Sequence, residues 1–239
     1  MPSVSIIIPA LNEEATIAAA VAHARATEPC EVIVADGGSR DRTVQWAKEQ
    51  GARVVVSRRG RARQQNTGVQ EATGDVFLFL HADNWLHASG VRQITAALAD
   101  REVLGGAFCQ RIESSGLAYR LLERGNALRA TWCRAPYGDQ GIFVRRTLFQ
   151  QLGGFPDVQL MEDLLLMRRF RRFARPVLLP GPLYVSPRRW QRNGVVRQTL
   201  RNWALVLAER LGAEPDRLAR YYPPHCEADQ ARPRPAEEN

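Results

Sequence analysis

Residues 4–39 indicate the fold class and read VSIIIPALNEEATIAAAVAHARATEPCEVIVADGGS. The segment begins with a run of valine and isoleucine at 4–9, continues with an alanine-rich helical composition at 13–26, and returns to an apolar strand at 31–35. Asn12 stands before the helical part and is expected to cap its N-terminus. A strand, a helix and a second strand joined by short turns predict a parallel βαβ unit.

The same alternation continues along the chain and becomes less regular in its middle. Further helices are expected at 41–50, 62–72, 88–99, 116–131 and 161–173, and further strands at 53–57, 76–80, 105–112, 142–145 and 176–179. We therefore expect an α/β protein with a central, mostly parallel sheet flanked by helices.

The last part of the chain predicts an amphipathic helix over 195–211. The residues on its apolar side are Val195, Val196, Thr199, Leu200, Trp203, Leu207 and Leu211. This side is expected to pack against the domain or to form a homodimer, and peripheral contact with an anionic membrane leaflet is the alternative. Trp46, Trp132 and Trp203 are expected to serve packing. We divide the chain into a domain (1–190), a helical extension (191–222) and a disordered tail (223–239) rich in Pro, Arg, Glu and Ala.

Composition narrows the class of protein. The 239 residues contain 33 Lys and Arg, nearly all of them Arg, and carry a net charge of +8, which indicates an anionic partner such as nucleotide phosphates. The four cysteines lie far apart, so neither a zinc site nor a disulfide framework is expected. No long apolar window and no secretory signal are apparent, which predicts a cytoplasmic protein with reduced thiols.

Polar residues follow three of the expected strands. They are Asn12-Glu13-Glu14, Asp36-Gly37-Gly38-Ser39 and His81-Ala82-Asp83. In an open α/β sheet the ligand binds beyond the carboxyl ends of the strands, so these turns are expected to form one site. Neither the G-x-G-x-x-G fingerprint nor a P-loop is present, which disfavours NAD and P-loop chemistry.

Several of these side chains suit a nucleotide. Asp36 can accept from a ribose hydroxyl or a base N–H, and Asp83 at the mouth of a buried strand suits a divalent metal or a diphosphate. Arg61 and Arg63 lie between a strand and a helix, where phosphate contacts are expected. A second candidate for the diphosphate, with a stacking ring, is the run Arg188-Arg189-Trp190.

The motifs SIIIPALNEE (5–14), DGGSRDRT (36–43), HAD (81–83), LGGF (152–155) and ED (162–163) together resemble the inverting glycosyltransferases of family 2. The similarity covers roughly residues 3–190. Three further motifs, GRARQQNTG (60–68), FLHAD (79–83) and YGDQG (137–141), resemble a small cytosolic branch of that family. That branch has been associated with arsenosugar biosynthesis and with radical-SAM and selenium-related gene neighbourhoods.

The resemblance implies a GT-A fold and a role for each matching residue. Pro9, Ala10 and Leu11, with Glu13 or Glu14, would line the base pocket, and Asp36 with its turn would hold uracil or ribose. Asp83 would bind Mn²⁺ or Mg²⁺ and the diphosphate, and Asp163, with Glu162 beside it, would be the general base. The acceptor would be lined by Gly138, Asp139, Gln140 and Gly141, and would be a small or lipid-linked molecule.

Two positions depart from the family pattern. Gly37 replaces the second acid of D-D-G-S, which removes one polar contact to the nucleoside. His81 replaces the first acid of D-x-D, and its imidazole suits Mn²⁺ better than Mg²⁺, so the metal requirement is weaker than in a typical member. The donor is expected to be a UDP-sugar, with GDP as the alternative.

Two other functions remain open from the residues alone. A nucleotidyltransferase would use a similar sheet, but Pro9-Ala10-Leu11 stands where such enzymes have a Gly-rich basic loop. A non-catalytic module that binds nucleotide sugars or nucleic acid would account for the charge, but no RNA-binding motif or zinc finger is visible. Nucleic acid is therefore not an expected partner.

Overall fold

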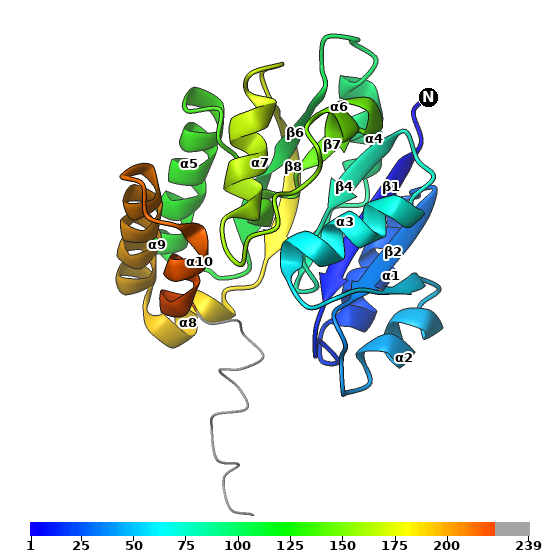
Figure 1. The fold of residues 1–239 in the computed structure, drawn as a ribbon, viewed down its shortest axis with the longest axis horizontal. Coiled ribbons are helices and arrows are strands. Elements are labelled where there is room, and N and C mark those ends of the chain that lie inside the picture. The colour runs from blue at the N-terminus through cyan, green and yellow to red at the C-terminus, as the bar shows by residue number, and fades with distance from the viewer. Residues whose placement is uncertain (223–239) are drawn as a thin grey trace, which may run out of the picture.

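The computed structural model describes residues 1–222 and builds them around one mixed sheet (Figure 1). Its strands are β1 (Val4–Ala10), β2 (Glu31–Asp36), β3 (Arg53–Val56), β4 (Val76–Phe79), β5 (Asn84–Leu86), β6 (Gly105–Ile112), β7 (Phe143–Arg145) and β8 (Val177–Val185). Its helices are α1 (Ile17–Ala26), α2 (Thr43–Glu49), α3 (Arg61–Glu71), α4 (Gly90–Ala97), α5 (Leu117–Trp132), α6 (Arg146–Gln151), α7 (Glu162–Phe170), α8 (Arg188–Asn193), α9 (Val195–Arg210) and α10 (Pro215–Leu218), with 3₁₀ turns η1 (Gly138–Gln140) and η2 (Ala219–Tyr221).

The strands are arranged in the order β3-β2-β1-β4-β7-β6-β8-β5. β1 lies between β2 and β4, and both pairings are parallel, with Ile6 opposite Val32 on one side and Leu78 on the other. β7 pairs antiparallel with both β4 and β6, so the sheet changes direction there. Four of the seven pairings within residues 1–222 are parallel, and the predicted parallel βαβ start of the chain is confirmed.

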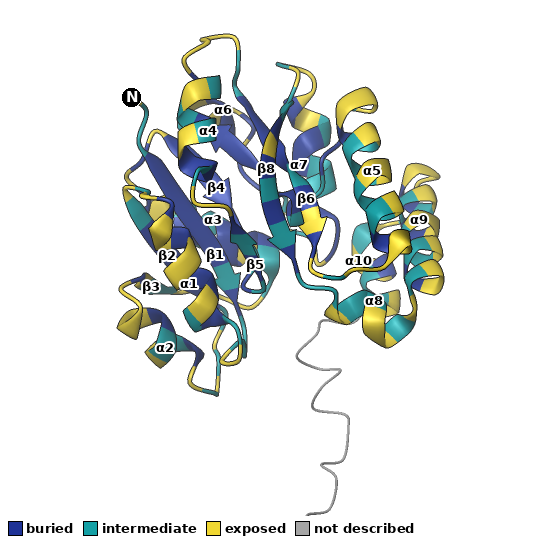
Figure 2. Ribbon diagram, turned by 180° about the vertical axis from the view of Figure 1, so that it is seen from behind, coloured by how far each residue is buried: buried dark blue, intermediate teal, exposed yellow. Residues whose placement is uncertain are grey.

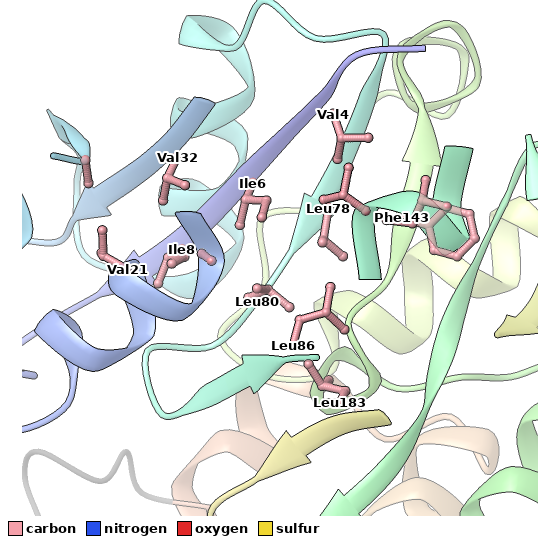
Figure 3. Close-up of a cluster of buried hydrophobic side chains, with 14 of the residues drawn as sticks. Val4, Ile6, Ile8, Val21, Val32, Leu78, Leu80, Leu86, Phe143 and Leu183 are labelled. Atoms are coloured by element: carbon pink, nitrogen blue, oxygen red, sulfur yellow. The ribbon is translucent and has the colours of Figure 1, made fainter. Parts of the chain in front are cut away.

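The period-2 alternation of β1 divides the core into two layers. Ile6 and Ile8 belong to one buried cluster, and Ile7 between them belongs to another on the opposite face. The first cluster joins β1, β2 and β4 to α1, α2 and α4 (Figure 3). The second packs the other face against α3, α6 and α7. Helices on both faces leave the strand ends as the part of the sheet open to a ligand.

Several expected elements differ in their bounds. Asn12 does not cap a helix: its φ is 54° and α1 begins only at Ile17. The Asn12 Oδ1 instead accepts a hydrogen bond from the N–H of Arg40 at 2.9 Å, because the loop after β1 is tied to the loop after β2. β5, α6 and α8 were not expected, and the strand expected at 176–179 continues to Val185. The boundary expected at residue 190 falls inside α8, and 223–239 lies outside the described residues.

The prediction that the apolar side of 195–211 packs against the domain is wrong. Residues on this side are exposed: Val196, Leu200, Trp203, Leu207 and Leu211. α9 instead turns Gln198 and Glu209 inward, where Gln198 hydrogen-bonds Asn193 and Asn202, and Glu209 pairs with Arg168. Those inward polar groups are satisfied by partners, which is why they tolerate burial.

α5 lies beside α9 at one end of the molecule (Figure 2). It has a second exposed apolar stripe. The stripe consists of Leu117, Leu121, Leu128 and Trp132. Trp132 and Trp203 are therefore not packing residues, whereas Trp46 contacts the core as expected. Within residues 1–222, no helix is both long and apolar enough to cross a membrane.

Candidate active site

The ends of β1 and β2 hold the first polar cluster. Ala10 stands opposite Asp36 in the parallel register, so the two strands end together. Asp36 is 4% exposed, and its carboxylate accepts hydrogen bonds from the N–H groups of Gly38 and Ser39 at 3.0 and 3.1 Å. The carboxylate therefore shapes the D-G-G-S turn, and its other lone pairs remain for a ligand.

Gln64 of α3 braces these strand ends. Its Nε2 donates to the carbonyl oxygens of Ala10 and Ala35 at 2.7 and 2.9 Å. A Cβ at Gly37 would lie 3.0 Å from the Gln64 side-chain amide. A side chain at position 37 would thus disturb the amide that ties β1 to β2, which explains the glycine there. The residues that flank Ala10, both half-buried, are Pro9 and Leu11.

The two acids after β1 point to different places. The Glu14 carboxylate accepts from the N–H of Arg42 at 3.1 Å, so it faces the start of α2. The Glu13 carboxylate accepts from the Thr16 hydroxyl at 3.1 Å, and burial followed by the nearby Asp83 raises its pKa. Glu13 therefore faces the site and Glu14 faces the neighbouring loop.

His81 and Asp83 follow β4, with the buried Ala82 between them. The Nε2 of His81 is buried and has no hydrogen-bond partner in the described part of the chain. Burial lowers the pKa of His81 to about 4, and the Arg61 guanidinium acts in the same direction, so the imidazole is neutral at neutral pH. The Asp83 carboxylate lies 3.2 Å from Nη2 of Arg188.

A divalent metal fits two of these side chains. Residues 1–222 contain no cluster of three or more His, Cys, Asp or Glu side chains that would enclose a metal. Mg²⁺ and Mn²⁺ at nucleotide sites take one or two protein ligands and complete their coordination with phosphate and water. The unpartnered Nε2 of His81 and the carboxylate of Asp83 fit such an open site.

The partly exposed Arg61 and the buried Glu162 form an ion pair between α3 and α7. The Arg61 Nε lies 3.2 Å from Oε1 of Glu162, which is only 1% exposed. Burial raises the pKa of Glu162 and Arg61 opposes that rise, while Glu162, and then the nearby Asp163, raise the pKa of Arg61. Glu162 is thus held in a pair, which leaves Asp163 as the more accessible of the two acids.

Asp163 lies against the loop expected to hold the acceptor. Its Oδ2 accepts a hydrogen bond from the N–H of Gly138, and its Oδ1 accepts from the N–H of Leu164 at 2.8 Å. A Cβ on Gly138 would lie 3.0 Å from Oδ2 of Asp163 and 3.3 Å from Nε2 of His81. A side chain at position 138 would therefore press on both the acid and the histidine.

Gln140 anchors the rest of that loop. It is fully buried, and its Oε1 accepts from Nη2 of Arg129 and from the N–H of Tyr137 at 3.0 and 3.1 Å. Burial raises the pKa of Asp139, whose Oδ1 has no hydrogen-bond partner within residues 1–222. Gly141 ends the turn with a φ of 64°. Gln140 is thus a support of the loop, and Asp139 is its unsatisfied acid.

The late arginines reach the same region. Arg188 pairs with Asp83, and burial, with help from Arg61, lowers the pKa of Arg189 to about 10. Trp190 contacts the ring of Tyr119 edge-on, with 6.4 Å between centroids. α8 therefore brings Arg188 and Arg189 to the histidine–aspartate turn, although it is distant in sequence.

Arg63 is not brought to this cluster. Its Nε pairs with the exposed Asp157 at 2.7 Å. Successive residues of a helix point about 100° apart, so Arg61 and Arg63 leave α3 in different directions. Of the two arginines expected to meet phosphate, the structure places only Arg61 beside the acids.

Comparison with known proteins identifies the enzyme class. Residues 5–152, which are more than half of the chain, match the family described as glycosyl transferase family 2. The chain belongs to glycosyltransferase family 2. It is an enzyme, and its fold is the GT-A fold of such transferases, as expected from the sequence.

Curated relatives include glycosyltransferases from two kinds of bacteria. The PGL/p-HBAD biosynthesis glycosyltransferase of Mycobacterium tuberculosis is 32% identical over 83% of this chain and 80% of its own length. The probable glycosyltransferase YdaM of Bacillus subtilis is 27% identical over 71% of this chain. The chain spans 46% of the length of YdaM, so that relative has a large part without counterpart here.

Solved structures of the fold include complexes with nucleotides. Glucosyl-3-phosphoglycerate synthase of M. tuberculosis, crystallised with Mn²⁺, UDP and glucosyl-3-phosphoglycerate, is 25% identical, with a TM-score of 0.58 over 77% of this chain and 71% of that one. TarS of S. aureus, crystallised with UDP-GlcNAc, has a TM-score of 0.60 over 77% of this chain and 58% of that one. Its 17% identity makes it a likeness of fold.

Motif reading missed how three residues of this transferase support the site. Gln64 braces β1 and β2, and Asn66 bonds both backbone groups of Phe155, accepting from its N–H at 3.0 Å and donating to its carbonyl at 2.8 Å. Arg129 holds Gln140. The motif GRARQQNTG contains Gln64 and Asn66 and was the available signal for both, whereas Arg129 lies outside every motif quoted above.

Proposed function

We propose that this transferase moves a sugar from a UDP-sugar to an acceptor hydroxyl with inversion at the anomeric carbon, and that Asp163 is the general base. The observation that carries the proposal is the position of Asp163 at the start of α7. Its carboxylate bonds Gly138 of the acceptor loop, and a Cβ on that glycine would also lie 3.3 Å from Nε2 of His81. Asp163 thus lies beside a residue assigned to the donor and a residue assigned to the acceptor.

The nucleoside would lie across the ends of β1 and β2. The backbone of Pro9, Ala10 and Leu11 would line the base, and Asp36 with its turn would meet the ribose. Glu13 borders this space on the side of Asp83. Gln64 holds the two strand ends at a fixed separation, so the nucleoside would meet a preformed pocket.

The diphosphate would lie at the turn after β4. Asp83 and the neutral His81 would hold Mn²⁺ or Mg²⁺, which supplies Lewis-acid stabilisation of the leaving phosphate when bound. Arg188 and Arg189 add fixed positive charge on the same side, and guanidinium groups suit phosphate oxygens. Arg61 contributes positive charge from α3.

The reaction then needs one proton transfer and one displacement. A carboxylate oxygen of Asp163 accepts the proton of the acceptor hydroxyl, and the oxygen attacks the anomeric carbon from the face opposite the diphosphate. The bond between that carbon and the diphosphate oxygen breaks, and UDP leaves with the bonding electron pair. Glu162 keeps α7 in place through Arg61 and is a positioning residue in this scheme.

The first test is titration calorimetry with UDP, GDP and CDP, each with and without Mn²⁺. We expect UDP to bind and the other two to bind more weakly. Failure of all three nucleotides to bind would contradict the donor site. Preference for GDP would keep the transferase and replace the donor, and cleavage of a UDP-sugar without sugar transfer to any hydroxyl would favour a different reaction.

Membership of the small branch associated with arsenosugar biosynthesis stays a prediction from motifs. The three motifs have clear structural roles in this protein, since they brace the strand ends, carry His81 and Asp83, and form the loop against Asp163. They therefore mark one particular construction of the site. Activity screens with the purified enzyme would identify the sugar and the acceptor that this site binds.

We also propose that the exposed stripes of α5 and α9 bind the anionic inner face of the cell membrane. Both stripes contain an exposed tryptophan, Trp132 and Trp203, a residue suited to the lipid interface. Three of the six arginines on the two helices are exposed, Arg124, Arg197 and Arg210, and their positive charge complements acidic lipids. Co-flotation with vesicles tests the proposal; a stable dimer without lipid binding would contradict it.

A further inference from the structure

A pocket of about 400 Å³ opens beside Asp163 and has no part in the scheme above. It lies where α5, α7 and α9 meet the loop before η1. The residues that line it are mostly cationic: Arg129, Arg168, Arg171 and Arg210, with Tyr137 and Leu164. A volume of this size accommodates a small molecule.

The protein balances the positive charge of this pocket only in part. Arg129 donates to the carbonyl of Ala135 and to Gln140, and Arg171 donates to the carbonyl of Cys133 at 2.8 Å, so both have neutral acceptors. Within residues 1–222, Arg168 is the one of the four that forms an ion pair with an acid, Glu209. The Arg129 charge also opposes the rise in the pKa of Asp139.

Arg210 is the least engaged of the four. Within residues 1–222 its side chain has no hydrogen bond or ion pair. Four guanidinium groups around one space repel each other unless an anion enters. A phosphate would offset about two of these charges and a carboxylate one, and either could accept planar, two-point hydrogen bonds from the guanidinium groups.

The pocket adjoins the proposed base from the acceptor side. Tyr137 and Leu164 line it, and they are the chain neighbours of Gly138 and Asp163, which are joined by a hydrogen bond. The Asp163 charge also contributes to the raised pKa of Tyr137. The nucleoside residues at β1 and β2 do not line this pocket.

We infer that the pocket binds an anionic group of the acceptor, a phosphate or carboxylate, while a hydroxyl of the same molecule reaches Asp163. This inference rests on the proposed function and adds the chemical class of the acceptor. The arginines supply the affinity, and Tyr137, with Leu164, covers the carbon chain that links anion and hydroxyl. Neutral sugars and neutral lipids would leave the arginines without counter-charge.

Binding of glycerol 3-phosphate and of glycerol to the UDP-saturated enzyme tests this inference. Saturation with UDP fills the donor site, so that phosphate cannot bind there. We expect glycerol 3-phosphate to bind and glycerol not to bind. Arg210→Gln and Arg171→Gln should each weaken glycerol 3-phosphate about tenfold, because each removes a charge-assisted hydrogen bond.

The matched controls are arginines outside the pocket on the same segments. Arg172→Gln, next to Arg171, and Arg197→Gln, on α9, should leave the affinity unchanged. Equal binding of glycerol and glycerol 3-phosphate, or full affinity in Arg210→Gln, would overturn the inference. UDP affinity is measured for the wild-type chain and for each variant. Absence of UDP binding to the wild-type chain counts against the proposed function. A variant that binds UDP but has lost glycerol 3-phosphate binding concerns this pocket alone.

A vesicle experiment distinguishes the source of the anion. Vesicles containing phosphatidic acid are added to the complex with glycerol 3-phosphate. Displacement that depends on Arg210 supports a lipid phosphate as acceptor group, in keeping with the apolar stripes of α5 and α9. Retention of glycerol 3-phosphate supports a water-soluble acceptor, and displacement that does not depend on Arg210 would argue against the pocket.

Discussion

The Nε of Arg61 lies 3.2 Å from Oε1 of Glu162, so the first residue of α3 holds the first residue of α7. α3 also carries Gln64, which braces the strand ends at the nucleoside side, and α7 carries Asp163, the proposed base. One ion pair thus connects the donor side of the site to the acceptor side.

Removing the cation of this pair should destabilise the protein. Arg61→Met leaves the Glu162 carboxylate buried without its partner, and we expect a loss of about 2–4 kcal/mol in the free energy of unfolding, below the fully buried case because Arg61 is 36% exposed. Glu162→Gln in that background should restore part of the loss because it removes the buried charge. Urea denaturation of the single and the double variant measures the free energy of unfolding. Equal stability of the two variants would contradict the cost assigned to the unpaired Glu162 carboxylate.

Replacing the proposed base should stop transfer without removing the donor. Asp163→Asn keeps an oxygen that accepts from Gly138 but cannot take a proton, so we expect kcat to fall about 10²–10⁴-fold. UDP affinity by calorimetry should stay near the wild-type value. Normal turnover by this variant would remove Asp163 from the base role.

The metal should act on nucleotide affinity through Asp83. We expect Mn²⁺ to strengthen UDP binding to the wild-type chain by about 5–150-fold, the usual range of coupling between two ligands. In Asp83→Asn this enhancement should largely disappear, while metal-free UDP binding persists through Arg188 and Arg189. Calorimetric titration with and without Mn²⁺ measures the UDP affinity of both proteins. If the wild-type chain binds UDP equally well in both conditions, the arginines and not a metal hold the diphosphate.

The close contact between Gly37 and Gln64 predicts non-additive effects. Gly37→Ala should cost about 1–3 kcal/mol because its Cβ meets an amide fixed by two hydrogen bonds. Gln64→Ala should cost about 1–3 kcal/mol by leaving two carbonyls without a donor. The double variant should lose less than the sum, since the alanine at 64 removes the clash.

A matched glycine gives the control for that experiment. A Cβ at Gly125 of α5 would meet nothing within 4 Å, so Gly125→Ala should stabilise the protein by about 0.5–1 kcal/mol. Thermal or urea unfolding of the four variants measures these changes in the free energy of unfolding. Strict additivity of the Gly37 and Gln64 changes would contradict the contact.

The apolar stripe of α9 should govern vesicle binding. Leu200→Gln together with Leu207→Gln should weaken binding to acidic vesicles about tenfold, because two leucines leave the lipid interface. The free energy of unfolding should change by less than about 0.5 kcal/mol, since both side chains are exposed. Val56→Gln, on the exposed edge of β3, is the control and should bind vesicles like the wild-type chain.

Local patterns were sufficient for much of the fold. The apolar run rich in isoleucine and valine at 4–9 predicted β1, and the expected strand 105–112 agrees with β6 at both ends. Helix bounds were less accurate where side chains bond outside their own segment. Asn12 shows this, because its amide bonds the distant Arg40 and not the first turn of α1. The face of α9 that turns inward could not be read from its sequence, because Gln198 bonds Asn193 of α8 and Glu209 pairs with Arg168 of α7.

The sequence by itself determined the parallel start of the sheet, the polar turns at its edge and the family of the enzyme, because these depend on short-range periodicity and on residues adjacent in the chain. Only the tertiary structure decided the roles within the site. In the folded chain Glu162 pairs with Arg61, and Asp163 accepts a hydrogen bond from Gly138. Arg63 pairs with Asp157, and four arginines line one pocket. The physical reason is that pairing, burial and charge balance depend on which distant segments meet, and packing of the whole chain decides that.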